Sequence, residues 1–180
     1  MKAYRYVIVG GGLAGGKACE GIRKVDEEGS IALVTDESHR PYQRPPLSKG
    51  YLAGRKGLDK VYLKKQEYYD EHDVDMTTGV AVQEIDHRAH TATLEDGRVF
   101  EYEKLLLATG GRAKRLPLSG ADLGRVFTLR TIEDSEAIQK AAESAEKALV
   151  LGGSFIGSEV AASLTQLGVQ VTMVFPESRL

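Results

Sequence analysis

An apolar run that ends in a glycine-rich turn constrains the fold of this chain more than any other feature. Residues 6–9 form the run, and three glycines follow with the spacing G-x-G-x-x-G: Gly10, Gly12 and Gly15. The first glycine allows a tight turn out of a strand, the second lets a pyrophosphate approach the backbone, and the third lets a helix pack closely. The amides of Leu13 and Ala14 would then face phosphates at the positive end of the helix dipole.

A second apolar run at residues 31–34 is followed by an acid, Asp36. A carboxylate about 20 residues after the glycines suits the hydroxyls of a ribose. Together with a helix over 13–24, the two runs predict a parallel βαβ unit. A turn built only for packing is the alternative, and the acid favours dinucleotide binding over it. The helix is expected to turn three apolar side chains inward: Leu13, Cys19 and Ile22.

The composition excludes several classes of protein. A formal net charge of −2, from 24 basic and 26 acidic residues, argues against binding to nucleic acid or to an anionic membrane. No apolar run approaches the ~20 residues of a membrane span. The single cysteine excludes an internal disulfide and a redox-active cysteine pair. The short stretch ahead of the first strand leaves no room for a signal peptide, so we expect a cytoplasmic protein.

The segment 39–52 carries three prolines within six residues, which keep its backbone extended. A loop after the second strand of a βαβ unit lies at the ligand-binding end of the sheet. There, Arg44 and Lys49 could hold the phosphates of a cofactor and contact its reactive ring. The alternative is a surface loop with exposed basic side chains.

Period-two alternation predicts a small antiparallel meander over residues 80–85, 90–94 and 98–102, with Asp96-Gly97 as a hairpin turn. His87 and His90 invite comparison with metal ligands, but no cysteine or carboxylate stands at ligand spacing. We therefore expect surface histidines and no metal.

A buried strand is predicted over residues 104–108, where Ala108 is its last residue and Thr109 and Gly110 follow. Small residues at the end of a strand allow the backbone to approach a ligand closely. A tight turn for packing alone is the alternative.

A second unit begins with a predicted strand at 126–129 and an alanine-rich helix that runs to about Lys147. Thr131 and Asp134 have capping-box spacing at its start. A strand at 148–151, a helix to Leu167 and a strand at 170–174 then predict another βαβ unit.

The turn of that second unit contains five residues of interest: Gly152, Ser154, Phe155, Ile156 and Gly157. Ser154 replaces the central glycine, and its side chain would crowd a pyrophosphate, which weakens the case for NAD(P)H without abolishing it. Glu159 is well placed for the positive end of the helix dipole.

The order of these features, with Pro-Tyr-Gln-Arg-Pro-Pro-Leu-Ser-Lys after the first acid, resembles the glutathione-reductase-like flavoproteins. More narrowly, it is similar to the branch of ferredoxin reductases (putidaredoxin and rubredoxin reductases), monodehydroascorbate reductases and apoptosis-inducing factor. The resemblance covers essentially the whole chain and matches the N-terminal part of that family. It implies FAD as cofactor, hydride uptake from NAD(P)H, and electron transfer to a ferredoxin, a rubredoxin, a quinone or another small acceptor. Without a redox-active cysteine pair, we do not expect a disulfide reductase.

The resemblance also implies roles for particular residues. Arg44 and Lys49 would contact FAD, with Lys49 near flavin N5 and paired there with Glu159. Val82 would contact the adenine through its backbone, and the Ala108-Thr109-Gly110 turn would lie against FAD. Phe155 has two open interpretations, core packing or an aromatic cover over the flavin.

The preference for NAD(H) over NADP(H) depends on Phe175-Pro176-Glu177, which stands where a ribose-binding acid is expected. Apoptosis-inducing factor and monodehydroascorbate reductases have a similar sequence there. Glu177 would accept from the ribose and repel a 2′-phosphate, whereas Arg179 points weakly to NADP(H).

These features predict an α/β fold with two Rossmann-like units and an inserted antiparallel β-meander, the second unit and the FAD domain being incomplete. We expect part of an FAD-binding domain over 1–113, a linker over 114–124 and part of an NAD(P)-binding domain over 125–180. Members of the resembling family continue further, so we expect a fragment that need not be active alone, holds FAD weakly or not at all, and forms homo-oligomers through incomplete sheet edges. The alternative function is a flavin-binding redox sensor or scaffold with slow turnover.

Overall fold

The computed structural model describes residues 1–176, which form two compact units. The first unit contains Met1–Gln43 and Tyr62–Gly111, and the second contains Arg44–Val61 and the described part of Arg112–Leu180. The predicted domain ranges treated Arg44–Val61 as part of the first domain, whereas the contacts of this segment group it with the second unit. The assignment of FAD binding and NAD(P) binding to the predicted ranges stays a prediction.

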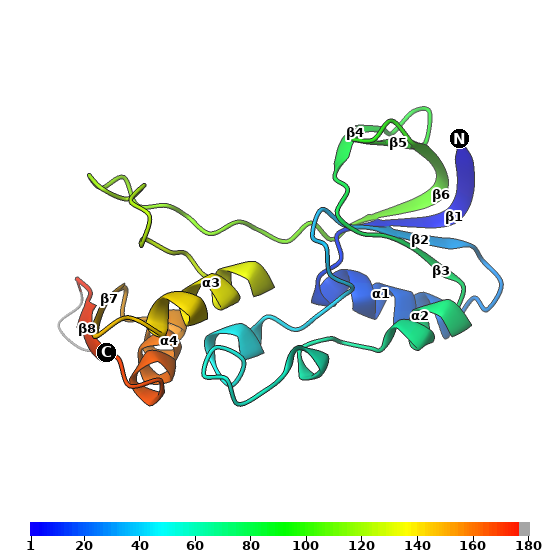
Figure 1. Ribbon diagram of the computed structural model, residues 1–180. Coiled ribbons are helices and arrows are strands. Elements are labelled where there is room, and N and C mark those ends of the chain that lie inside the picture. Colours follow the sequence, from blue (N-terminus) through cyan, green and yellow to red (C-terminus); the bar gives the residue numbers. More distant parts are fainter. Residues whose placement is uncertain (177–180) are drawn as a thin grey trace. The chain divides into compact units, whose positions relative to one another are not determined.

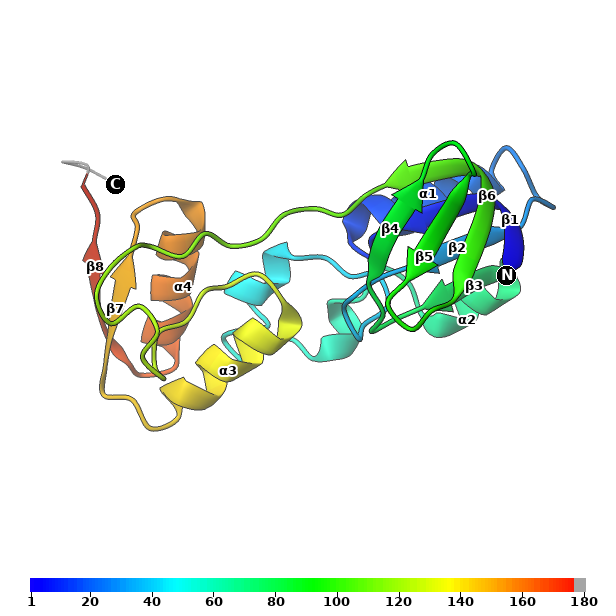
Figure 2. The ribbon, with the colours of Figure 1, turned by 90° about the horizontal axis from the view of Figure 1, so that it is seen from above.

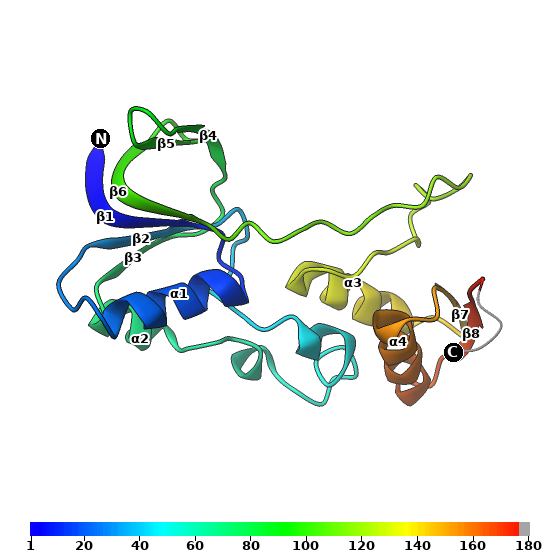
Figure 3. The same cartoon turned by 180° about the vertical axis from the view of Figure 1, so that it is seen from behind.

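The first unit is built on a six-stranded sheet with the order β3-β2-β1-β6-β5-β4 (Figure 1). Its strands are β1 Lys2–Val9, β2 Ile31–Val34, β3 Val74–Thr77, β4 Val82–Asp86, β5 Thr91–Leu94 and β6 Val99–Leu107. The pairs among β3, β2, β1 and β6 are parallel, and β4 and β5 add an antiparallel edge. Two helices, α1 (Leu13–Arg23) and α2 (Gln66–Glu71), lie on the same face of β1, β2 and β3 (Figures 1 and 3).

The predicted meander is continuous with the parallel sheet, because β6 belongs to both. The first half of β6 pairs with β5, and most of its length pairs with β1. The two predicted strands at 98–102 and 104–108 are therefore a single strand. The prediction that 104–108 is buried was wrong for Lys104, Leu106 and Leu107, which are all exposed, the two leucines by 42% and 59%. Leu105 packs against the core, whereas these two leucines lie beyond it at the carboxyl end of the strand.

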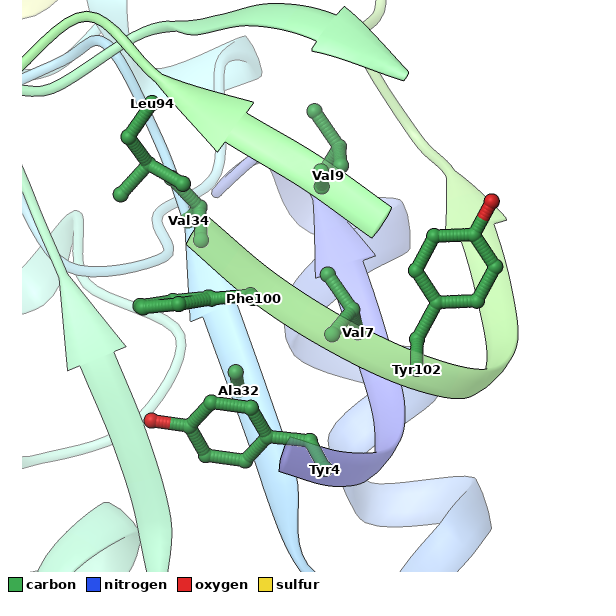
Figure 4. Packing of buried hydrophobic residues seen from close by; sticks show 9 residues of the cluster. Tyr4, Val7, Val9, Ala32, Val34, Leu94, Phe100 and Tyr102 are labelled. Carbon is green, nitrogen blue, oxygen red and sulfur yellow. The ribbon is translucent and has the colours of Figure 1, made fainter. Parts of the chain in front are cut away.

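The sheet bends so that the meander packs across the parallel strands, and one core fills the bend (Figure 4). It contains Tyr4, Val7, Val9, Ala32, Val34, Ala92, Leu94, Phe100 and Tyr102. The opposite face of the parallel strands packs on the helices through a second cluster: Ile8, Cys19, Ile31, Leu33, Tyr69 and Val74. Alternate residues of each strand enter different cores, as the period of a strand requires.

Within α1, Cys19 is buried as predicted, and Ile22 packs against the second cluster. Leu13 is 47% exposed, so its predicted inward position was wrong. It is the first residue of the helix and lies at the end of the strand rather than over the sheet. Burial raises the pKa of the Cys19 thiol to about 12, which leaves it un-ionised and unreactive at neutral pH.

The second unit contains α3 (Ile132–Ala142), β7 (Lys147–Leu151), α4 (Phe155–Gln166) and β8 (Gln170–Val174). Strands β7 and β8 pair in parallel and α4 packs against both, which confirms the second βαβ unit (Figure 2). Two short 3₁₀ helices, Pro45–Ser48 and Leu58–Lys60, belong to the same unit. Leu52 from this early segment joins a core cluster with Ile138, Ala142, Leu164 and Val169.

The predicted capping box at the start of α3 is present: the Thr131 hydroxyl accepts from the Asp134 amide, and the Asp134 carboxylate accepts from the Thr131 amide. Two other predictions here were wrong. Residues 126–129 are not a strand, since the described sheet of this unit holds only β7 and β8 and the Val126 amide donates to the Leu123 carbonyl in a turn. Helix α3 also ends at Ala142, several residues before Lys147, where β7 begins.

Replacing Gly15 by alanine should destabilise the first unit by about 2 kcal/mol or more, because the new Cβ would overlap the Gly10 carbonyl oxygen. Gly21→Ala is the matched control on the same helix, since a Cβ there meets nothing within 4 Å. It should raise the free energy of unfolding by about 0.5–1 kcal/mol. Urea unfolding followed by circular dichroism measures both, and an unchanged midpoint for Gly15→Ala would contradict the packing described.

Candidate functional site

The first glycine turn joins β1 to α1 and leaves open space at the start of the helix. Gly10 has φ +116°, a left-handed conformation that side chains rarely adopt, and its amide donates to the Val34 carbonyl at 2.7 Å. Gly15 packs so closely on Gly10 that no Cβ fits between them. Gly12 is the N-cap residue, and a Cβ on it would meet nothing within 4 Å. The structure thus forms a cradle of backbone amides with room in front of it.

The carboxyl ends of β1, β2 and β6 meet at this cradle because the three strands are parallel and adjacent. Asp36 is exposed two residues after β2 ends. On the other side, the Ala108 amide donates to the Val9 carbonyl at 2.7 Å, and the exposed Thr109 and Gly110 follow it. The first unit therefore brings the predicted Asp36 and Ala108-Thr109-Gly110 to the same edge of the sheet as the glycine turn.

Val82 reaches the same edge through hydrogen bonds of the chain just before it. The Gly79 amide donates to the Glu37 carbonyl at 2.9 Å, and the Val80 amide to the Thr35 carbonyl at 3.0 Å. Val82 then begins β4, half-buried. The backbone ahead of Val82 thus lies alongside the segment that carries Asp36.

Sequence reasoning missed Gly16, where helix α1 meets the chain that follows β2. A Cβ on Gly16 would lie 2.7 Å from the Pro41 Cβ and 2.7 Å from the Leu63 Cδ2. The doubled glycine at positions 15 and 16 was the available signal. Gly15 allows the helix to approach the end of β1 at Gly10, and Gly16 allows it to approach Pro41 and Leu63 in the chain that follows β2. Each of the two glycines therefore has its own packing reason.

The second glycine turn repeats the geometry of the first. Gly152 has φ +111°, its amide donates to the Val174 carbonyl at 2.8 Å, and Gly157 packs on it without room for a Cβ. Ser154 occupies the N-cap position of α4, as Gly12 does for α1, and it is exposed. The next two residues, Phe155 and Ile156, are 87% and 55% exposed, so Phe155 does not pack in the described core of its unit.

Lys49 and Glu159 form an ion pair within the second unit. The Lys49 ammonium lies 2.9 Å from Glu159 Oε1, and the Ser48 hydroxyl donates to Glu159 Oε2 at 2.6 Å. These hydrogen bonds, that of Ser48 first and that of Lys49 second, hold the pKa of the Glu159 carboxyl below its usual range. The side chains of Lys49 and Glu159 remain 50% and 26% exposed, so the pair presents a fixed charge arrangement at the surface of its unit.

Arg44 and Arg130 lie together at the start of α3. The Arg44 guanidinium donates to the Arg130 carbonyl, and the Arg130 amide donates to Asp134 Oδ2 at 2.7 Å. The Arg130 Nε is buried, and no acceptor among the described residues reaches it. A buried donor of this kind needs an acceptor. Sequence reasoning missed Arg130, and its place directly before the capping box was the only local signal.

Two other expectations concern a metal and a ribose-binding acid. No group of three or more potential metal ligands occurs among the described residues. The His90 ring stacks on Tyr102, and its Nδ1 lies 3.2 Å from the Tyr102 carbonyl. Glu177 lies outside the described residues, as does Arg179.

Comparison with known proteins defines the class of this chain. The model of the pyridine nucleotide-disulphide oxidoreductase family matches residues 4–180, so the chain belongs to that family. It is 38% identical over 97% of its length to the ferredoxin reductase subunit of the 5,5′-dehydrodivanillate O-demethylase of Sphingobium sp. (strain NBRC 103272 / SYK-6), covering 42% of that protein. It is 41% identical over 93% of its length to the rhodocoxin reductase of Rhodococcus erythropolis, covering 39% of it.

Among solved structures, the chain resembles putidaredoxin reductase in its covalent complex with putidaredoxin. The TM-score is 0.86 at 38% identity, over 94% of this chain and 42% of the other. The chain thus spans about two fifths of the length of the relatives it matches.

The family uses FAD and NAD(H), and the residues present fit such nucleotides. The cradle at Gly12 has open space where a pyrophosphate would bind, with Asp36 beside it for a ribose. The buried Nε of Arg130, which has no acceptor within the described part of the chain, offers a donor for an anionic group. At the second turn, Ser154 stands where the first turn has Gly12; it is exposed, and no side-chain capping bond holds it.

Replacing Lys49 by glutamine should raise the pKa of Glu159 toward the ordinary glutamate value, because the ammonium no longer stabilises the carboxylate. Since this pKa is depressed in the folded state, the pair stabilises the fold at neutral pH, and the contribution is lost as pH falls below about 4.5. A ¹³C carboxyl NMR titration measures the change.

Lys60→Gln serves as the control for that titration, since among the described residues Lys60 pairs with its neighbour Asp59 and not with Glu159. It should leave the Glu159 titration unchanged. An equal response of Glu159 to both substitutions would show that general charge, and not the ion pair, lowers its pKa.

Proposed function

We propose that this chain is the nucleotide-binding part of an FAD-dependent oxidoreductase that takes electrons from NADH and delivers them to a ferredoxin- or rubredoxin-type protein. A quinone or another small acceptor is the alternative recipient. The observation that carries the proposal is the open cradle at Gly12, with Asp36 and the Ala108-Thr109-Gly110 turn at the same edge of the sheet. The similarity to rhodocoxin reductase and to putidaredoxin reductase supports this class of acceptor.

Each unit contributes its own residues to the proposed activity. In the first unit, the amides of Leu13 and Ala14 would bind a pyrophosphate, Asp36 a ribose, and the backbone at Val82 an adenine. FAD, when bound, supplies the ring that accepts hydride from a nicotinamide and passes electrons on singly. These residue roles are proposed on the basis of family membership and of the geometry of each glycine turn.

In the second unit, Lys49 and Glu159 would hold a fixed charge and hydrogen-bond arrangement for the flavin ring, and Arg44 and Arg130 would meet anionic groups of the cofactor. The turn at Gly152, Ser154, Ile156 and Gly157 would bind the nicotinamide dinucleotide. Phe155, exposed at the start of α4, is free of the described core and suits a cover for a flat ring.

NADH is favoured over NADPH on the sequence at Glu177, whose carboxylate would repel a 2′-phosphate. The domain ranges proposed for this function are 1–113 for FAD, 114–124 for the linker and 125–180 for NAD(P). A cytoplasmic location belongs to the same proposal. Among the described residues, no helix is long and apolar enough to cross a membrane.

The proposal is tested by reconstituting the chain with FAD, removing the excess and recording the visible spectrum before and after anaerobic addition of NADH. We expect at most weak flavin retention, and bleaching by NADH then measures hydride transfer to the flavin that remains bound. Gly12→Ala should weaken FAD binding about tenfold or more, since the methyl group enters the space for the pyrophosphate and tenfold corresponds to about 1.4 kcal/mol.

Gly21→Ala is the control for FAD affinity, because it adds the same methyl group on the same helix in open space. Both variants should keep the wild-type fold by circular dichroism. A Gly12→Ala variant with undiminished FAD affinity would refute the proposed cofactor site, whereas a chain that retains no flavin would show that this part of the protein does not hold FAD alone.

We also propose that the chain forms homo-oligomers through the uncovered face of β7 and β8. Leu149, Leu151 and Val174 are 60%, 50% and 50% exposed on this face, whereas parallel sheets in proteins are usually covered on both sides. Light scattering should give at least a dimer at micromolar concentration. The double substitution Leu149→Gln, Leu151→Gln should shift it to monomer, and Thr172→Gln on the same face should not. A wild-type monomer at all concentrations would contradict this.

A further inference from the structure

Residues of helix α4 contact both the side chains and the backbone carbonyls of the dipeptide Ser48-Lys49. The side-chain contacts are those to Glu159 described above. One helical turn further along, the Ser163 hydroxyl lies 2.8 Å from the Ser48 carbonyl and 3.3 Å from the Lys49 carbonyl. Because residues four apart share one face of a helix, Glu159 and Ser163 contact the same dipeptide from the same side.

The backbone contact lies deeper than the ion pair. Ser163 and Ser48 are 2% and 5% exposed, whereas the side chain of Glu159 is 26% exposed and that of Lys49 is 50% exposed. A buried carbonyl needs a donor and a buried hydroxyl needs an acceptor, so each partner satisfies the other. The Ser48 carbonyl is thus fixed behind the two charged groups that face outward.

The Ser48 hydroxyl has a single proton to donate, and its position depends on the peptide that carries it. The shorter of its two contacts is with the Glu159 carboxylate, at 2.6 Å against 3.4 Å to the Pro45 carbonyl. A hydrogen bond to a charged acceptor is also the stronger kind. A shift of the Ser48-Lys49 peptide away from α4 would lengthen this bond and weaken the hold on the Lys49 ammonium.

We propose that Ser163 is a positioning residue for the Lys49–Glu159 pair: its buried hydroxyl fixes the Ser48-Lys49 peptide, and thereby the Ser48 hydroxyl and the Lys49 ammonium against the Glu159 carboxylate. The inference rests on the proposed function, which assigns this pair to the flavin ring. Ser163 itself would touch neither cofactor nor substrate. Among the described residues, Lys49 supplies the charge that faces Glu159.

Ser135 provides a matched control on helix α3. Ser135 is 1% exposed and its hydroxyl donates to the Leu47 carbonyl at 2.8 Å, so it makes the same kind of buried contact to the preceding peptide. Among the described residues, its hydroxyl bonds the Leu47 carbonyl, whereas that of Ser163 bonds the Ser48 and Lys49 carbonyls. Ser135→Ala therefore reproduces the loss of one buried hydroxyl in this segment without the proposed positioning effect.

The test is a ¹³C carboxyl NMR titration of Glu159 in the full chain without flavin. In Ser163→Ala, the pKa of Glu159 should rise by about half a pH unit toward its ordinary value, because its two donors are no longer fixed. Ser163→Cys, which fills the same space with a weak donor, should give a similar rise and guards against collapse of the cavity. Ser163→Thr keeps the hydroxyl and should restore the wild-type titration, as should the Ser135→Ala control.

Each outcome decides the proposal. A wild-type pKa for Glu159 in both Ser163→Ala and Ser163→Cys would overturn it, as would an equal rise in Ser135→Ala, which would indicate general loosening of the segment. If Ser163→Ala does not fold, the cysteine variant carries the decision. Because the titration needs no flavin, it gives its answer even if the chain fails to bind FAD, so failure of this inference and failure of the proposed function are separate results.

Discussion

The close approach of a helix to the strand before it is the constraint on which both units depend. At Gly10 and Gly15, and again at Gly152 and Gly157, the helix begins so near the strand that no Cβ fits between them. This contact directs the amino end of each helix toward the carboxyl edge of its sheet, where the positive end of the helix dipole favours anions. The same edge in the first unit collects Asp36 and the turn after β6 because the strands there are parallel.

Features that depend on short stretches of chain were predictable from the sequence. The glycine turns, the capping box at Thr131 and the strands β2, β7 and β8 follow from residue types at fixed local spacing. The predictions that failed depended on distant partners. Residues 126–129 have strand-like composition, but in the described structure they have no strand beside them, and an isolated strand leaves its backbone groups unpaired.

The candidate site also contains some features that local sequence predicts and others that depend on distant contacts. Spacing alone indicates the cradle at Gly12, because every group in it lies within a few residues of the turn or at the end of a neighbouring strand. The contact between Ser48 and Glu159 joins positions 111 residues apart, and no periodicity in the sequence indicates it. Resemblance to a family suggested the Lys49–Glu159 pairing, whereas the serine hydroxyls behind it and the unpaired Nε of Arg130 required coordinates.

The chain leaves the first unit at Gln43, contributes Arg44–Val61 to the second unit, and returns to the first unit at Tyr62. This path affects the order in which the two units can fold. Leu52 is fully buried in a cluster whose other buried members are Ile138, Ala142, Leu164 and Val169. On a ribosome, which adds about 5–20 residues per second, Leu52 is synthesised on the order of ten seconds before that cluster is complete. Until then the segment must remain a long open loop, and closing it carries the entropy cost of a non-local contact. The second unit is therefore expected to be the slower of the two to form, and its apolar surface is the one that a nascent chain exposes longest.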